Sequence, residues 1–145
     1  MSDAKRNQGH SWYTAQAEPY CDTGVSGDWK GNGWYLFVEP AGTQMADSDP
    51  SGKIHLKNPK IMLFNRLHSL SLPDKNGHYC GTAANGWLNG AHPTTLRENV
   101  IRTVCIAWDG NSCLWNTDVE IRMCSEFFVY KLKNVPVCNS KYCAK

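Results

Sequence analysis

The side chains with the most versatile chemistry in this 145-residue chain are five histidines and seven cysteines. No histidine lies in a His-Glu-x-x-His helix motif, and no serine lies in a Gly-x-Ser-x-Gly elbow. A catalytic site needs groups that converge, and no pair among the 13 acidic residues is distinguished in this way. We therefore expect a protein that is not an enzyme. The histidines are His10, His55, His68, His78 and His92.

Metal ligation is the second chemistry that these residue types allow. His78 stands two residues before Cys80, and Cys138 stands five before Cys143, but neither spacing completes a tetrahedral Cys/His set. The acidic segment 47–52 lacks the regular oxygen spacing of an EF-hand loop, so a solvated turn is the better interpretation. The sequence predicts neither a metal nor a cofactor.

Carbohydrate recognition is the chemistry best supported by one short stretch, residues 85–92. A sugar site needs an aromatic face for the apolar side of the pyranose and planar amides or imidazoles for its hydroxyls. Trp87 offers the ring, and Asn85, Asn89 and His92 offer the polar groups. The alternative is that Trp87 fills the core below a loop whose Asn and Gly residues serve left-handed turns.

A second candidate surface is the glycine-rich turn around Asp28 and Trp29. Trp29 stands outside any strand pattern, so we expect it to be more exposed than Trp34. The turn residues Asp109 and Asn111 are candidates to join either surface. We assign the remaining tryptophans outside these surfaces to the core, namely Trp34, Trp108 and Trp115.

Cysteine usage and charge bound the class of protein. Scattered cysteines in a small domain predict a disulfide framework and an extracellular location, and the odd number leaves one thiol free or bonded to another chain. The net charge of +2 is spread without a basic stripe, which disfavours nucleic acid as a partner. No apolar run reaches the 18 residues of a membrane span, and residues 1–16 lack the apolar stretch of a signal peptide.

The elements that must position these side chains are mostly strands. Residues 34–38 predict a buried strand ended by Pro40, and residues 53–57 and 61–64 predict a hairpin. Residues 100–108 predict a strand, preceded from 95 by one or two helical turns, and the alternation over 119–123 and 127–132 predicts a second hairpin. Residues 81–95 predict a long surface loop. The fold class is mainly β, a small disulfide-stapled sheet or sandwich with long loops and little helix.

A longer set of residues carries a family resemblance from about Cys21 to Cys143. It comprises Trp34-Tyr35-Leu36-Phe37-Val38, Gly42, Met45, Cys80-Gly81-Thr82, Trp87-Leu88-Asn89-Gly90-Ala91-His92-Pro93, Cys105-Ile106-Ala107-Trp108, Cys113-Leu114-Trp115, Cys124, Phe128-Val129-Tyr130-Lys131-Leu132, Cys138 and Tyr142-Cys143. This pattern resembles the cysteine-rich (ten-cysteine) domain of the uromodulin and pancreatic zymogen-granule membrane glycoprotein family. The resemblance implies a polar arm over 1–20 and one domain over 21–145, with a hairpin inserted at about 46–79.

The resemblance also implies the disulfide pairs Cys21–Cys138, Cys80–Cys143 and Cys105–Cys113. The family's cysteine shortly after Met45 is absent here, and its partner position holds Ser112, so both halves of one bridge are missing together. Cys124 is left over, because its family partner lies upstream and no cysteine precedes Cys21. It is therefore expected to be either buried and free or joined to another chain.

The departures from the family shape the functional hypothesis. In the family, this domain belongs to a glycan-bearing decoy for bacterial adhesins that precedes a polymerising module. Here Asn89 is not in a glycosylation sequon, only the weak Asn111-Ser112-Cys113 remains, and no such module follows. We therefore expect a secreted lectin-like module that binds a glycan or glycoprotein, with a role in adhesion and avidity gained as a homo-oligomer. The alternative is a protein-binding or structural extracellular module without sugar binding.

Overall fold

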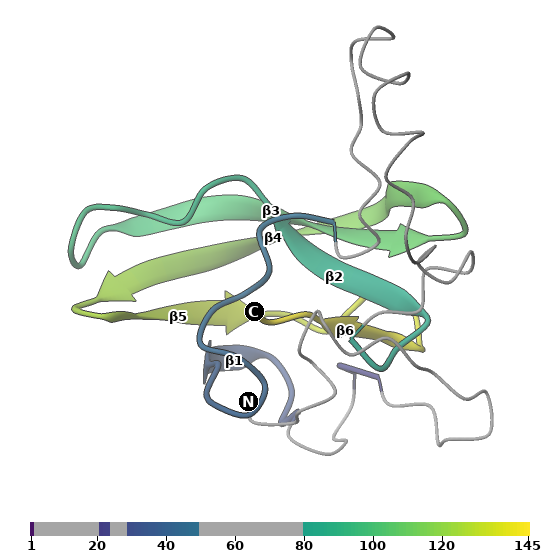
Figure 1. Cartoon of the computed structure of the whole chain (residues 1–145), viewed down its shortest axis with the longest axis horizontal. Helices are drawn as coiled ribbons and strands as arrows, with labels where there is room; N and C mark the ends of the chain where they lie inside the picture. The colour runs from purple at the N-terminus through teal and green to yellow at the C-terminus, as the bar shows by residue number, and fades with distance from the viewer. Residues whose placement is uncertain (2–20, 24–28, 50–79) are drawn as a thin grey trace, which may run out of the picture.

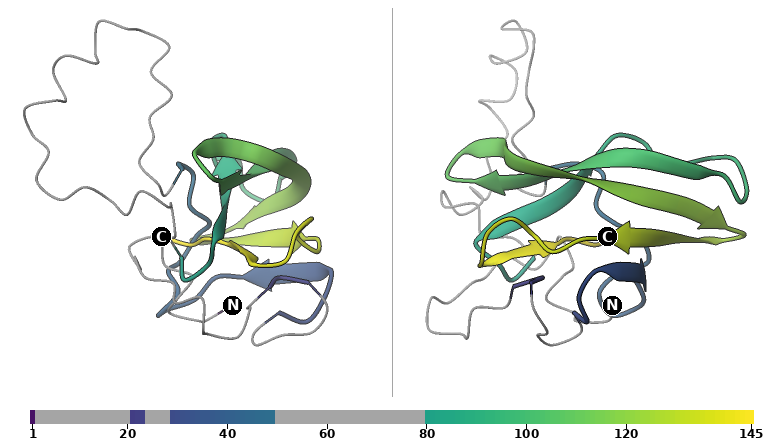
Figure 2. Two further views of the ribbon diagram at one scale, coloured as in Figure 1. Left: turned by 90° about the vertical axis from the view of Figure 1, so that its right-hand side faces the viewer. Right: turned by 180° about the vertical axis from the view of Figure 1, so that it is seen from behind.

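A computed structural model describes residues 1, 21–23, 29–49 and 80–145, which form one curled six-stranded sheet (Figures 1 and 2). The strand order is β1-β5-β4-β3-β2-β6, and every neighbouring pair is antiparallel except β2 and β6, which are parallel. None of these described residues lies in a helix, so the mainly β prediction is confirmed. The strands are β1 (Gly33–Leu36), β2 (Ala84–Asn89), β3 (Asn99–Trp108), β4 (Asn111–Cys124), β5 (Phe127–Leu132) and β6 (Ser140–Tyr142).

Two tight turns connect the three central strands. Asp109 and Gly110 join β3 to β4 with φ angles of 44° and 82°, and two positive φ angles are what a type I′ hairpin turn requires. Ser125 and Glu126 join β4 to β5, with Ser125 at φ 58°. The predicted strand 100–108 and the predicted hairpin 119–132 are thus confirmed, whereas the helical turns expected from 95 are not formed.

The core lies on the inner face of the curled sheet. Alternate residues of β3, β4 and β5 point into it, because neighbouring side chains of a strand face opposite sides. Side chains from residues 29–46 and from the end of the chain complete the same cluster. The largest fully buried apolar and aromatic side chains of the core are Trp29, Phe37, Met45, Leu88, Val104, Ile106, Ile121, Tyr130, Leu132 and Tyr142.

Three of the expected tryptophan positions are wrong. Trp29 is fully buried, stacks on Tyr35 with ring centroids 4.8 Å apart, and donates from Nε1 to Asn134 Oδ1 at 3.2 Å. Trp34 is 47% exposed, because the core side of β1 is taken by its neighbour Tyr35. Trp108 is 37% exposed at the end of β3. Trp115 is half-buried against the core.

The expectation of a surface loop over 81–95 is also wrong, because β2 lies inside that stretch and is largely buried between β3 and β6. Its glycine is part of the reason. A Cβ on Gly86 would lie 2.9 Å from the carbonyl oxygen of Lys141 on β6, so the parallel pair requires glycine there. The strand predicted over 34–38 is present as β1, but it is half-buried rather than buried.

Three disulfides staple the sheet: Cys21–Cys138, Cys80–Cys143 and Cys105–Cys113. They are the pairs that the family resemblance implies. Cys124 is a free thiol and is half-buried. The expected arm over 1–20, the hairpin over 53–64 and most of the insertion fall outside the described residues. Within the part of the chain that the structure describes, no helix is long and apolar enough to cross a membrane.

Candidate functional site

The structure separates the four residues proposed as one sugar-binding loop. Asn85, Trp87 and Asn89 share one face of β2, but Asn85 is 1% exposed while Asn89 is exposed at the strand's end. His92 lies beyond β2 and is engaged elsewhere. Asp28, from the second candidate surface, is outside the described residues, and its neighbour Trp29 is buried.

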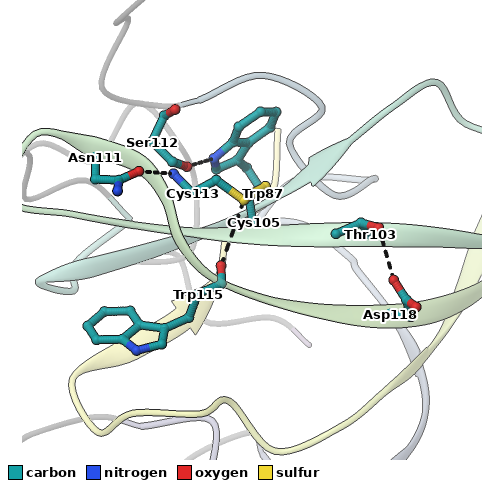
Figure 3. Close-up of a disulfide and its surroundings, with 8 residues drawn as sticks. All are labelled: Trp87, Thr103, Cys105, Asn111, Ser112, Cys113, Trp115 and Asp118. Carbon is teal, nitrogen blue, oxygen red and sulfur yellow. Dashed lines mark hydrogen bonds between the residues drawn. A yellow bond between two sulfur atoms is a disulfide. The ribbon is translucent and has the colours of Figure 1, made fainter.

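Trp87 is a packing residue. It is half-buried against the cluster of Ala46, Cys80 and Cys143, and its Nε1 donates to the backbone oxygen of Ser112 at 2.9 Å (Figure 3). Its ring therefore joins β2 to the start of β4. This arrangement matches the alternative interpretation from sequence, in which Trp87 fills space under its segment.

His92 belongs to a network that no sequence pattern indicated. Its side chain is only 9% exposed, its Nε2 lies 2.9 Å from the hydroxyl of Tyr130, and its Nδ1 lies 3.6 Å from Asp47. Lys145 donates to the other carboxylate oxygen of Asp47 at 2.6 Å. Burial lowers the pKa of His92 and outweighs the opposing effect of the Asp47 charge.

Asp47 responds in the opposite way to its surroundings. Partial burial by itself would raise the pKa of this carboxyl group, but the hydrogen bond and charge of Lys145, with a smaller effect of His92, hold it below its usual value. The network therefore contains an ionised carboxylate, a lysine and a neutral imidazole. We regard it as a structural link between chain segments.

The β3–β4 hairpin end is held rigidly by an irregularity and a disulfide. Ile106 pairs with Trp115 and Trp108 pairs with Asn111, so Ala107 on β3 faces three residues of β4, which bulge. Cys113, in this bulge, is bonded to Cys105, and its N–H donates to Asn111 Oδ1 at 3.0 Å (Figure 3). Side chains at this end are therefore displayed on a braced scaffold.

This hairpin end exposes an aromatic ring beside polar groups. Trp108 is 37% exposed and meets Trp115 edge to face, with centroids 6.3 Å apart. Leu114 is 44% exposed, and the side chains of Asp109 and Asn111 are exposed. We call these five residues the hairpin-end surface. An aromatic face with a carboxylate and an amide can stack on a pyranose and bond its hydroxyls, or hold a side chain of a partner.

Sequence reasoning found two residues of the hairpin-end surface, Asp109 and Asn111, and assigned Trp108 to the core. The signal for Trp108 was its place directly before the Asp-Gly turn, where a β3 side chain runs out of neighbours. Among the described residues, no group of three His, Cys, Asp or Glu side chains could hold a metal ion.

Comparison with known proteins gives consistent matches. The family model of the uromodulin-like cysteine-rich domain matches residues 65–144. Pancreatic secretory granule membrane major glycoprotein GP2 of Canis lupus familiaris is 35% identical over 113 residues, which are 77% of this chain and 17% of that protein. Uromodulin of Rattus norvegicus is 33% identical over 121 residues, 83% of this chain and 15% of that protein. The chain thus spans about a sixth of the length of these two relatives.

Proposed function

Because the chain belongs to the uromodulin-like domain family, we propose that it is an extracellular, non-catalytic recognition module that binds carbohydrate through the hairpin-end surface. The family and the three disulfides support an extracellular setting, since such bridges persist in oxidising compartments. The proposal that it has no catalytic role rests on the separation of its chemically capable side chains. His92, in particular, is buried among structural partners.

The observation that carries the sugar-binding proposal is the exposure of Trp108 on a disulfide-braced turn, between Asp109 and the bulge that follows Asn111. A rigid aromatic platform binds a pyranose with little loss of side-chain entropy. Asn111 Oδ1 already accepts from the Cys113 N–H, so its amide donors are the groups that a sugar hydroxyl would meet. Asp109 supplies the acceptor.

Protein binding without sugar is the second candidate, and a different surface favours it. Trp34, Lys131, Glu120 and Ile101 form one row across β1, β5, β4 and β3 on the outer face. Ile101 is 68% exposed and Trp34 is 47% exposed, while Lys131 pairs with Glu120 at 3.7 Å. Apolar ends around a central ion pair are typical of a protein contact.

A glycan array of the oxidised protein tests the first proposal, with Trp108→Ala as the site variant and Trp34→Ala as the matched control. Both tryptophans are exposed on the same sheet, so neither change should unfold it. We expect selective binding that Trp108→Ala abolishes and Trp34→Ala preserves. A blank array with folded protein would refute sugar binding and favour the second candidate.

We also propose that copies of the chain associate to gain avidity, since single sugar sites bind weakly. Light scattering of the purified protein at several concentrations measures this directly. A disulfide between copies would use Cys124. In that case, wild type would run as a dimer without reductant and Cys124→Ser as a monomer, whereas a monomeric wild type refutes the covalent form.

A further inference from the structure

We propose that a second ligand site lies at the opposite end of the β3–β4 ribbon from the hairpin-end surface, and that it takes an acidic sugar through two arginines. The site is a surface hollow of about 470 Å³ lined by Leu96, Arg97, Arg122, Cys124, Ser125 and Phe127. It lies where the β4–β5 turn meets the connection into β3. The inference stands whether or not Trp108 binds a sugar.

The backbone brings the two arginines together. Arg97 has φ 64°, a left-handed conformation that is strained for an arginine, and its N–H donates to the carbonyl oxygen of Met123 at 2.9 Å. Arg122 then donates from Nε to the carbonyl oxygen of Arg97 at 3.3 Å. This bond uses one edge of the Arg122 guanidinium, so the terminal Nη groups are the donors that a ligand would meet.

The lining of the hollow carries two positive charges and no carboxylate. Neither Arg97 nor Arg122 forms an ion pair with a carboxylate among the residues that the structure describes. The nearest carboxylate along β4, Glu120, is already contacted by Lys131 at 3.7 Å and by Asn99 at 2.6 Å. Two guanidinium groups in one hollow match a carboxylate or sulfate, which they can bind through paired N–H donors.

The rest of the lining says what should carry that oxyanion. The volume exceeds what a lone inorganic anion fills, and the rim bears the Phe127 ring, 44% exposed, and Leu96, 53% exposed. An aromatic ring beside an oxyanion site suits a pyranose that bears a carboxylate or sulfate. A second copy of the chain is a poor occupant, because a two-fold contact would place four arginines face to face.

Titration of the isotope-labelled protein with 3′-sialyllactose, lactose and sodium sulfate, followed by amide NMR, tests this assignment. We expect 3′-sialyllactose to bind with a Kd of about 0.1–1 mM at low salt and to shift the amides of Arg97, Cys124 and Phe127. Sulfate should shift the Arg97 and Arg122 amides more weakly, and lactose should leave all of these unchanged. Bound sialyllactose should also slow alkylation of the Cys124 thiol by iodoacetamide.

The variants Arg97→Gln and Arg122→Gln should each weaken sialyllactose binding about tenfold, because each removes charge-assisted hydrogen bonds. Arg102→Gln is the matched control, since Arg102 lies on the same sheet, donates to Ala91 outside the hollow and carries the same charge. Equal binding of lactose, an equal loss in Arg102→Gln, binding of only an acidic peptide such as hexaglutamate, or no shift at all would each overturn the proposal. Binding at Trp108 would shift different amides and so is scored separately.

Discussion

The Nε2 atom of His92 lies 2.9 Å from the hydroxyl oxygen of Tyr130, which ties the connection after β2 to the buried side of strand β5. The same hydroxyl accepts the N–H of Met45 at 3.0 Å. A neutral His92 fits this arrangement, because its Nε2 can accept the Tyr130 proton while its Nδ1–H faces Asp47. Protonation of the ring would place a second donor against a hydroxyl that needs an acceptor.

The first prediction is a loss of stability on mild acidification. Burial lowers the pKa of His92 below the value of 6.5 that it has when the chain unfolds. The unfolded state therefore binds more protons, so stability rises with pH through the range below about 6.5 and is lost as pH falls. Thermal unfolding of wild type and His92→Gln between pH 5 and 8 measures this. The variant should be less stable at pH 8 and show a shallower pH dependence; identical slopes would contradict the assignment.

The second prediction concerns Gly42, which has φ 120° and touches the backbone of Lys145. A Cβ there would lie 2.6 Å from the Lys145 oxygen, which also accepts the N–H of Thr43 at 2.9 Å. We expect Gly42→Ala to destabilise the fold by about 2–4 kcal/mol, from overlap and backbone strain together. Gly33→Ala is the control, because nothing lies near its added Cβ. Denaturant unfolding should leave that control unchanged or slightly more stable.

The third prediction contrasts two tryptophans. Trp29→Ala should cost about 3–5 kcal/mol, because it removes a fully buried ring that stacks on Tyr35. Trp34→Ala should cost less than about 1 kcal/mol, since nearly half of that side chain already meets water. Urea unfolding under oxidising conditions compares them, and equal losses would mean that Trp29 is not in the core.

The fourth prediction ranks two disulfides by the length of chain that they enclose. Cys21–Cys138 spans 117 residues and Cys105–Cys113 spans 8, so loop-closure entropy assigns them about 5 and about 2.5 kcal/mol. Replacing each pair by serines and measuring denaturant unfolding should give losses in that order. A larger loss for the short bridge would show that it acts by holding the bulge rather than by restricting the unfolded chain.

The strands β3, β4 and β5 were predictable because each shows alternation between a buried and a solvated face over part of its length. Strand β2 was not, since Ala84–Asn89 lies between two strands and contains small and amide residues without alternation. Trp29 misled for another reason. Its neighbours along the chain are polar, but its burial is decided by distant partners such as Asn134, which lies 105 residues away.

The candidate site was predictable only where local signals decide geometry. Asp109 and Asn111 follow from the turn, and the disulfide pairs follow from the family resemblance. The position of His92 could not be deduced, because its partners Asp47 and Tyr130 come from segments distant in the sequence. Likewise, Arg97 and Arg122 meet only through the pairing of β3 with β4.

The bridge from Cys21 to Cys138 has a mechanical consequence. If the chain is pulled from points before Cys21 and after Cys143, the tension passes through that covalent bond and skips residues 22–137. The sheet then bears almost no load, and the protein can lengthen only by its terminal segments. Under tension it would act as a short inextensible link, and reduction of one bond would turn it into a spring more than a hundred residues long.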